Sequence, residues 1–386
     1  MKRIIFTLGV LLAPMLSACV SARPATPLAA DTLVYSDNLA RARQEQLLLN
    51  IVKLRYNDPV SFIEVDKLTT TDTTVVSGGL GSALGLDDGP FTEVLSGNVG
   101  TSRVHSPQIV YNALKGEAYA TQLLRPLSAA SVFLMSQSGW SVERLLLCCI
   151  ARIGDVENAR AAAGPTPTEL PDNSEYRALA AHLRALQQTS GLIVQVVEGE
   201  GEDDDATPQV VMKWRVDTEA GRAAADLFTQ HRIGKLEPLS NNRVMAVISA
   251  SGDEIGDFSV RGRSLLGILS ALSQTVRVPT EHAALTVQTR DDRALTERMA
   301  RNDTAHACRA AGPWPRVIGD YFAVNSSKDR PDSAAVAVPY RGYWFYVDDR
   351  CRSAKATLDL IGHLYALQAG VSGADGSQSI FLLGGG

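Results

Sequence analysis

The chain has 386 residues, a formal net charge of −5, and hydrophobic residues at 45% of its positions. This composition is ordinary for a globular protein, and the length is enough for two or three domains, although one large domain would also fit. The mildly acidic balance argues against a general nucleic-acid-binding protein, which needs a basic surface to displace counterions from phosphates.

The N-terminal residues have the order of a secretion leader. Lys2 and Arg3 are followed by an apolar run over residues 4–12 and then by Leu-Ser-Ala-Cys at 16–19. The run is shorter than the roughly twenty residues of a membrane-spanning helix, and it fits the hydrophobic region of a signal peptide. This order resembles the lipobox of bacterial lipoproteins, in which the leader is removed and the cysteine, here Cys19, is lipidated. The alternative is an ordinary cleaved signal peptide, with Cys19 as an unmodified downstream residue.

The resemblance implies a location. Acyl chains contribute about 0.8 kcal/mol per buried CH₂, and stable anchoring needs more than one chain. A multiply acylated Cys19 behind a signal peptide at 1–18 would therefore hold a folded body at a membrane. Val20 stands where many lipoproteins of the inner membrane have aspartate, so the resemblance implies the periplasmic face of the outer membrane. Removal of the leader would change the formal charge from −5 to −7, because Lys2 and Arg3 leave with it and no acidic residue does.

The body begins with a predicted tether, helix and hairpin. Residues 19–36 are rich in Ala, Pro and Thr without periodicity, which predicts a lipidated flexible tether. Apolar residues recur at helical spacing over 37–56, and the proline at 59 predicts the end of that helix. Residues 60–76 have a strand-like composition. The Gly- and Ser-rich stretch 78–90 predicts a hairpin tip, since a phosphate-binding loop would need the Gly-Lys-Ser/Thr ending that it lacks.

The remaining elements follow from periodicity and breaking residues. Strands at 192–197 and 209–216 predict a hairpin around the acidic run 198–205, which lacks the alternating carboxylates of a calcium loop. The other predicted helices are 116–124, 128–137, 141–153, 173–188, 218–230, 265–276, 294–301 and one capped by Ser353, and the other predicted strands are 108–111, 243–250, 258–260, 336–340, 343–347 and 379–383.

A domain boundary is predicted at the Pro- and Thr-rich residues 164–171. It divides the body into an N-terminal domain, 37–163, and a C-terminal domain, 164–386. Helices and strands are mixed without strict β-α-β alternation, so the predicted fold class is α+β with mainly antiparallel sheets.

Four cysteines lie beyond Cys19. Cys308 and Cys351 lie in polar, loop-like surroundings, and in an oxidising periplasm they are predicted to form a disulfide. Cys148 and Cys149 are adjacent in an apolar helix, where cysteine usually packs as a small hydrophobic residue. Thiol chemistry at this pair is a third, weaker hypothesis. The cysteines and histidines lack the spacing of a metal site, so no metal or cofactor is predicted.

The densest aromatic stretch of the chain covers residues 340–346, around a predicted turn at Arg341-Gly342. Tyr343, Trp344 and Tyr346 are candidate partner-binding residues, because Tyr and Trp offer a large apolar area with a polar tip. The alternative is that they are ordinary core residues of a hairpin. Asp348 and Asp349 follow directly; they are interpreted as the end of the strand beside Arg350 in preference to a catalytic carboxylate pair, since adjacent strand residues point to opposite faces.

Two functions remain open from the sequence. The first is a membrane-anchored envelope lipoprotein that binds or scaffolds another envelope protein in the periplasm, with no nucleic acid as partner. The second is a periplasmic hydrolase that acts on cell-envelope material, with its residues brought together only by the fold. The sequence contains neither a Gly-x-Ser-x-Gly elbow nor a His-Glu-x-x-His helix, which favours the first hypothesis.

Overall fold

The computed structural model describes residues 27–83, 94–159, 172–197, 208–249, 259–286, 307–309 and 314–372. Within them the fold is α+β with antiparallel sheets, as predicted. The elements are α2 (Pro27–Arg55), β1 (Ile63–Ala83), β2 (Val94–Ala113), α3 (Gly116–Tyr119), the π-helical turn η1 (Ala120–Leu124), α4 (Ala129–Gln137), α5 (Val142–Cys149), β3 (Ile150–Ile153), β4 (Val156–Glu157), α6 (Ser174–Gln188), β5 (Leu192–Val197), β6 (Gln209–Arg215), α7 (Glu219–Gln230), β7 (Lys235–Leu239), β8 (Arg243–Ser249), β9 (Val260–Gly262), α8 (Leu265–Ser273), the 3₁₀ helix η3 (Thr280–Leu285), α10 (Pro315–Ile318), β10 (Asn325–Ser327), β11 (Ala334–Tyr340), β12 (Tyr343–Asp348) and α11 (Arg352–Ser372).

Helix α2 is packed at its C-terminal end and exposed at its N-terminal end. Leu48 and Ile51 are fully buried, whereas Leu33 is 72% and Val34 57% exposed. The helix begins at Pro27, a residue that the first helical turn accepts because its N–H needs no partner there. The prediction of a flexible tether is therefore wrong for residues 27–36. Periodicity detected only the packed part of the helix, because an exposed part needs no apolar stripe.

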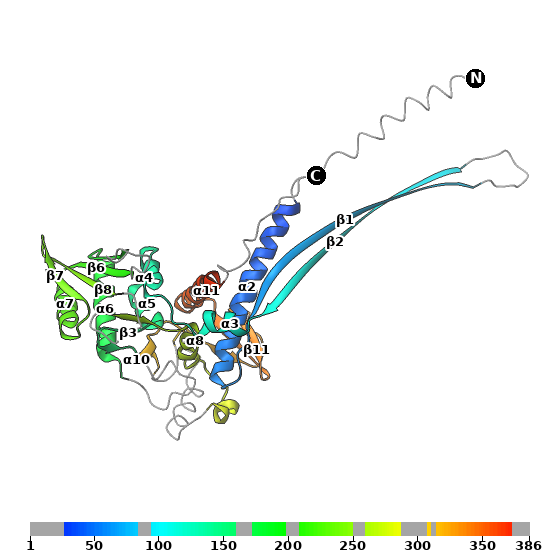
Figure 1. Cartoon of the computed structure of the whole chain (residues 1–386). Helices are drawn as coiled ribbons and strands as arrows, with labels where there is room; N and C mark the ends of the chain where they lie inside the picture. Colours follow the sequence, from blue (N-terminus) through cyan, green and yellow to red (C-terminus); the bar gives the residue numbers. More distant parts are fainter. Residues whose placement is uncertain are drawn as a thin grey trace, which may run out of the picture.

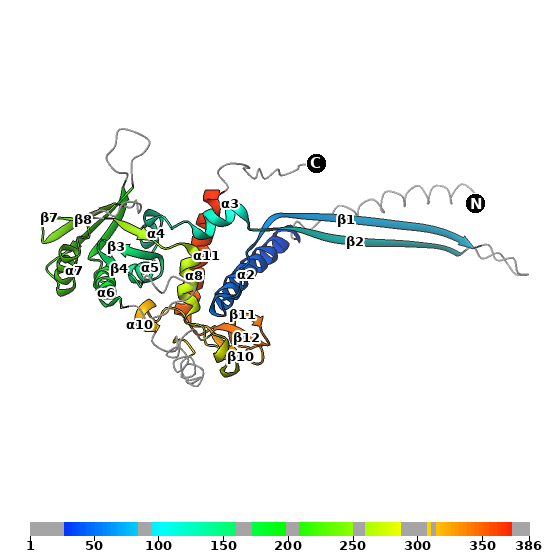
Figure 2. The ribbon, with the colours of Figure 1, turned by 60° about the horizontal axis from the view of Figure 1, so that its bottom comes forward.

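Strands β1 and β2 form a long two-stranded ribbon that leaves the body (Figure 1, Figure 2). Their antiparallel register runs from Ile63 paired with Ala113 to Ala83 paired with Val94. At about 3.3 Å per residue, β1 is on the order of 65 Å long. The prediction of a hairpin tip at 78–90 is wrong for residues 78–83, which belong to β1. The rest of that stretch lies outside the described residues.

Helix α5 is shorter than predicted, because the chain leaves it after Cys149 and continues as β3. The buried amide of Asn158 explains this end: its Nδ2 donates to the carbonyl oxygens of Leu146, Leu147 and Ile150 at 3.0, 3.0 and 2.8 Å. These are among the carbonyls that the end of a helix leaves without a backbone partner. Strand β3 then pairs with β4 and β9.

A four-stranded antiparallel sheet in the order β5-β6-β8-β7 forms the part of the body farthest from the ribbon (Figure 1). The predicted hairpin of β5 and β6 is confirmed, with Leu192 paired with Trp214 and Val197 with Gln209. Its acidic connection, 198–205, lies outside the described residues. Strand β7, with the sequence Lys-Leu-Glu-Pro-Leu, was not predicted. Its proline is tolerated because β7 lies at the edge of the sheet.

The third region of the body combines the sheet β10-β12-β11 with α8 and α11. The predicted hairpin at Arg341-Gly342 is confirmed, since Tyr340 pairs with Tyr343 across the turn. A single cluster of buried apolar side chains includes Leu48 of α2, Trp214 of β6 and Leu364 of α11. This cluster takes in residues from both sides of the predicted boundary at 164–171, which lies outside the described residues; the division into two domains stays a prediction.

Candidate functional site

The ribbon is the first candidate site, because both of its long edges lack a neighbouring strand among the described residues. In an antiparallel pair, alternate N–H and C=O groups of each strand point away from the partner, so a free edge is a template for another strand. Large apolar side chains are also exposed near its base: Ile63 at 50%, Ile109 at 42%, Val110 at 47% and Tyr111 at 61%. A cluster of exposed apolar residues of this kind is typical of an interaction surface.

The base of the ribbon is fixed to α2 by a buried asparagine. Asn50 is 1% exposed; its Nδ2 donates to Ser61 O at 2.8 Å, and its Oδ1 accepts from Ser61 N at 3.0 Å. One turn earlier, Gln46 Nε2 donates to Ile63 O at 3.1 Å. The adjacent Phe62 is buried and stacks on Tyr365 of α11, with ring centroids 5.6 Å apart. These contacts set the direction in which the ribbon leaves the body.

At the base of the ribbon, Glu64 connects β1 with two other elements, η1 and α11. Its Oε1 accepts hydrogen bonds from Gln122 Nε2 of η1 at 2.9 Å and from the Tyr365 hydroxyl of α11 at 3.0 Å. Burial and the neighbouring carboxylate raise the pKa of Tyr365, so its hydroxyl stays protonated and able to donate. The interaction could not be predicted from the sequence, because Glu64 and Tyr365 are 301 residues apart.

A cleft of about 500 Å³ opens beside Glu64, between α2, the ribbon base and α11. This volume is within the usual range for small-molecule sites. The lining is mainly apolar, with Arg43 and Glu64 as its charged members, and it contains no serine, cysteine or histidine; it consists of Leu39, Ala42, Arg43, Gln46, Leu47, Ile63, Glu64, Val65, Tyr111, Gly362, Tyr365, Ala366 and Ala369. Such a cleft can hold an apolar group, but it lacks a nucleophile paired with a base.

The aromatic candidates of β12 are all partly buried, and two of them are covered by cations of the same chain. Lys328 Nζ lies 4.4 Å from the centroid of the Tyr343 ring, and the guanidinium of Arg330 lies 5.6 Å from that of Trp344. The Tyr343 hydroxyl donates to Glu281 of η3, while burial raises the pKa of Tyr346. These contacts support the packing interpretation; partner binding by Tyr343, Trp344 and Tyr346 stays a prediction.

A polar network that sequence reasoning missed holds the same hairpin against the end of α2. Asp58 Oδ2 accepts from Arg341 Nε at 3.2 Å and Nη2 at 2.7 Å, and also from the Tyr340 hydroxyl. The hydrogen bond from Tyr340 and the charge of Arg341 lower the pKa of Asp58. Beside it, Tyr56 and His282 share a 2.8 Å hydrogen bond, and burial lowers the pKa of His282, which favours the neutral imidazole. The arrangement joins α2, η3 and the β11–β12 turn.

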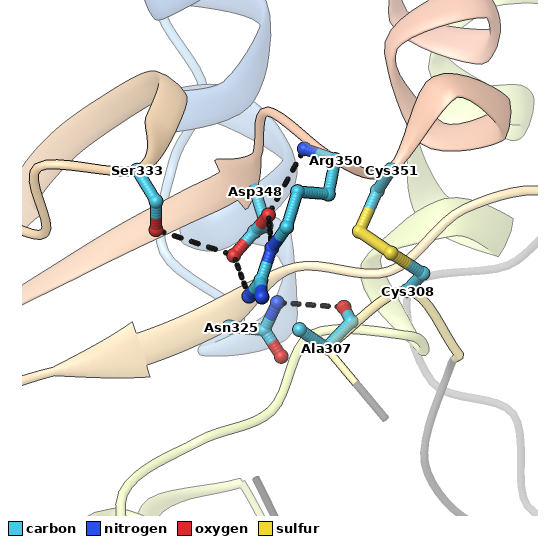
Figure 3. A network of polar contacts seen from close by, with 7 residues as sticks. All are labelled: Ala307, Cys308, Asn325, Ser333, Asp348, Arg350 and Cys351. Atoms are coloured by element: carbon cyan, nitrogen blue, oxygen red, sulfur yellow. Dashed lines mark hydrogen bonds and ion pairs between the residues drawn. A yellow bond between two sulfur atoms is a disulfide. The ribbon is translucent and has the colours of Figure 1, made fainter. Parts of the chain in front are cut away.

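The disulfide and Asp348, at the end of β12, lie close together in a second group of contacts (Figure 3). Cys308 and Cys351 are joined by a disulfide, the pairing favoured from the sequence. The side chain of Asp348 is 2% exposed; its Oδ1 and Oδ2 each accept from the Arg350 guanidinium at 2.9 Å. Hydrogen bonds from Arg350 lower the pKa of Asp348 to about 2. Asp349 instead pairs with Lys355 at 2.6 Å. The two carboxylates therefore bind different cations and do not converge on a common position.

The adjacent thiols lie in α5, with Cys149 buried and Cys148 partly exposed, and both are free. A hydrogen bond with Cys148, together with burial, raises the pKa of Cys149. The nearest cavity at Cys148 has a volume of about 10 Å³, which is about the space of a single water molecule. The site therefore has no room for a substrate, and the two thiols pack as core side chains.

Among the described residues, no group of three or more His, Cys, Asp or Glu side chains is placed to hold a metal ion. In the described ranges, no helix combines the length and the apolar character needed to cross a membrane. Cys19, the boundary 164–171, the helix at 294–301 and the strand at 379–383 lie outside the described residues.

The chain was compared with known proteins at three levels. No protein-family model, no curated protein and no solved structure matches it.

Proposed function

We propose that the protein is a lipoprotein of the bacterial outer membrane, anchored on the periplasmic face through acyl chains on Cys19, which binds or scaffolds another component of the envelope. The observation that carries this proposal is the ribbon, a protruding element with two free edges that leaves the body beside α2. A protruding, unpaired strand edge is suited to association.

The position of α2 supports the proposal that Cys19 is a lipid anchor. Its first residue, Pro27, follows Cys19 by eight residues, and Leu33 and Val34 near its start are exposed. In both views this exposed end and the ribbon leave the body on the same side (Figure 1, Figure 2). A membrane that holds Cys19 would therefore lie on the side to which the ribbon points.

The hydrolase alternative receives no comparable support from the described residues. The cleft at the ribbon base has one carboxylate, Glu64, whose Oε1 is already engaged by Gln122 and Tyr365. Hydrolytic sites instead bring a nucleophile or an activated water within hydrogen-bond distance of a base. We therefore do not extend the proposal to catalysis.

The anchor is best tested in a chain with a shortened ribbon, so that lipid anchoring is measured without any contribution from the ribbon. Residues 70–107 are replaced by Asn-Gly, a two-residue turn that joins the paired positions Thr69 and Gln108. Cells are labelled with radioactive palmitate and separated into membrane and soluble fractions. We expect the shortened chain to carry the label and to sediment with membranes, and its Cys19→Ala variant to lose both properties.

A Cys148→Ala variant of the same shortened chain is the matched control, and it should keep the label and the membrane location. If the Cys19→Ala variant remained labelled or membrane-bound to the same extent as its parent, the anchor would be refuted. The readout does not depend on the identity of the envelope partner.

A further inference from the structure

The ribbon is long for an element whose backbone hydrogen bonds join only two strands. It contains twenty register pairs and has no third strand among the described residues, although an isolated two-stranded ribbon is at best marginally stable in water. Natural sheets protect free edges with charges, prolines or bulges. In β1 and β2 the one irregularity lies near the base, between Val65 and Lys67. The proline and the charges of the two strands, among them Pro107, Asp72 and Arg103, also lie nearer the body than Val75, so the register pairs from Val75 to Ala83 have none of these protections.

The composition of the ribbon changes along its length. Residues 75–83 and 94–102 contain no Asp, Glu, Lys or Arg, and they form the nine register pairs from Val75 with Ser102 to Ala83 with Val94. Charged residues occur nearer the body, at Asp72 and Arg103. A strand that crosses the hydrocarbon layer of a membrane needs about 9 to 11 residues. The uncharged end of the ribbon thus has the length of one crossing.

The ribbon is much longer than the part of α2 that leaves the body beside it. From the contact between Gln46 and Ile63, α2 runs 19 residues to Pro27, about 30 Å at 1.5 Å per residue. From the same contact β1 runs 20 residues to Ala83, about 65 Å at 3.3 Å per residue. Measured along the two elements, the ribbon is therefore about 35 Å longer than this part of α2, slightly more than the roughly 30 Å of the hydrocarbon core.

We propose that copies of this chain join edge to edge through their ribbons, β1 of one copy against β2 of the next, and that the joined ribbons cross the hydrocarbon layer of the membrane that holds Cys19. The inference rests on the proposed function, because the shared anchor is what aligns the copies. The occupant of each free edge is a second copy of this chain.

The geometry of anchored copies selects this pairing over its alternatives. Copies held in one membrane point their ribbons in the same direction, so β1 of one copy and β2 of the next run antiparallel, as they do within one copy. An antiparallel pairing of β1 with β1 would require ribbons that point in opposite directions. The β1–β2 contact is head-to-tail, and such a contact propagates from copy to copy, giving a ring where the rotation closes and an open array where it does not.

Closing the ribbons into a ring would also satisfy the backbone hydrogen bonding that a hydrocarbon layer requires. Backbone N–H and C=O groups in lipid must all find partners within the protein, which a single ribbon with two free edges cannot provide. A closed ring of ribbons leaves no edge. At the base, the neighbouring copy would in addition cover apolar side chains that are now exposed, among them Ile63, Ile109 and Val110.

Disulfide crosslinking of the full-length chain tests the pairing. Two differently tagged copies are co-expressed, one with Ser77→Cys in β1 and the other with a single cysteine in β2, placed in turn at Ser96, Thr101, Ser102 and Ser106 so that both faces of the strand are sampled. Membranes are oxidised and two-tag dimers are counted. We expect one or more of these combinations to give a two-tag dimer severalfold above the level of the parental chain, which carries Cys148 and Cys149 alone as free thiols in its described part.

The matched control combines Ser77→Cys with Ser77→Cys. In the proposed sheet the two β1 strands are separated by a β2 strand, about 10 Å apart, beyond the 7 Å that a disulfide allows between Cα atoms. Dimers from this pair alone, or no two-tag dimer at any register, would overturn the edge pairing. Because the membrane fraction is measured in the same samples, a lost pairing with retained anchoring refutes this inference and leaves the proposed function intact.

Lipid contact is tested with the purified full chain in vesicles of phosphatidylethanolamine and phosphatidylglycerol. A fluorophore is attached at Val76→Cys or Ser77→Cys, because successive strand residues alternate between the two faces, and spin-labelled lipid is added as quencher. We expect quenching at one or both sites and none at the matched sites Thr69→Cys and Thr70→Cys. Equal fluorescence with and without quencher at both distal sites would overturn the membrane crossing.

Discussion

Asp348 is an almost fully buried carboxylate with an exposed partner, Arg350, whose side chain is 76% exposed. Hydrogen bonds from Arg350 and Ser333 lower its pKa to about 2, against 3.8 for an unperturbed group. We predict that Asp348→Asn lowers the free energy of unfolding at pH 7 by about 1 to 2 kcal/mol, less than the full shift would give because solvent screens the exposed guanidinium. Chemical denaturation measures this difference.

The pH dependence has a defined sign. Because the pKa of Asp348 is lower in the folded state, its contribution is present above about pH 4 and is lost as the pH falls toward 2. The difference in stability between the wild type and Asp348→Asn should therefore disappear near pH 2. Asp349→Asn is the matched control: its carboxylate is 67% exposed and pairs with Lys355, so its effect should stay under about 0.5 kcal/mol. Equal effects of the two variants would contradict this account.

Asn158 binds the carbonyls at the end of α5 from 8 to 12 residues away, and its Oδ1 also accepts from Asn173 Nδ2 at 3.0 Å. We predict that Asn158→Ala destabilises the body by about 2 to 4 kcal/mol, because several buried polar groups lose their partner. Thermal unfolding followed by circular dichroism measures the effect. The control is Asn112→Ala on the exposed base of β2, which should change little; a similar loss for both would show that the buried amide has no special role.

At the scale of elements, the sequence predicted those parts whose signals are local. Ser128 and Thr218 cap α4 and α7 as helix-starting residues, and Arg341-Gly342 forms the turn between β11 and β12. Elements that depend on distant partners were missed. The end of α5 depends on Asn158, and β7 is a strand because β8 pairs with it, although its own composition is poor for a strand.

The outer part of the ribbon and residues 27–36 of α2 were missed for a different reason. Periodicity detects the side of an element that packs on a core, and these two elements extend away from the core (Figure 2). Local patterns predicted strand at 60–76 and 108–111, which is correct except for residues 60–62, but the Gly- and Ser-rich continuation resembled a loop. Similarly, the Ala-, Pro- and Thr-rich start of α2 resembled a tether.

Because β1 and β2 hydrogen bond to each other and to no other described strand, the body should fold without the outer ribbon. We predict that replacing residues 70–107 by Asn-Gly leaves the midpoint of thermal unfolding of the body nearly unchanged. Phe62→Ala, at the buried base of the ribbon, should by contrast cost about 3 to 5 kcal/mol through loss of packing. Loss of cooperative unfolding in the shortened chain would contradict the separation of ribbon and body.

At the scale of the whole molecule, the relevant feature is that α2 and the ribbon point to the same side (Figure 1). The direction depends on contacts between residues far apart in the sequence, such as Phe62 with Tyr365 and Glu64 with Tyr365. No local pattern encodes these contacts, so the sequence could predict an anchor and a hairpin but not their alignment. In our proposal, that alignment would connect an anchor at Cys19 with an assembly through the ribbons.

The most direct test of the central claim is the mass of the detergent-extracted particle, measured by mass photometry for the full chain and for the chain with the shortened ribbon. We expect the full chain to give a single large species of many copies, and the shortened chain to give monomers, although both carry the same anchor. Monomers in both samples, or the same large species in both, would contradict the account.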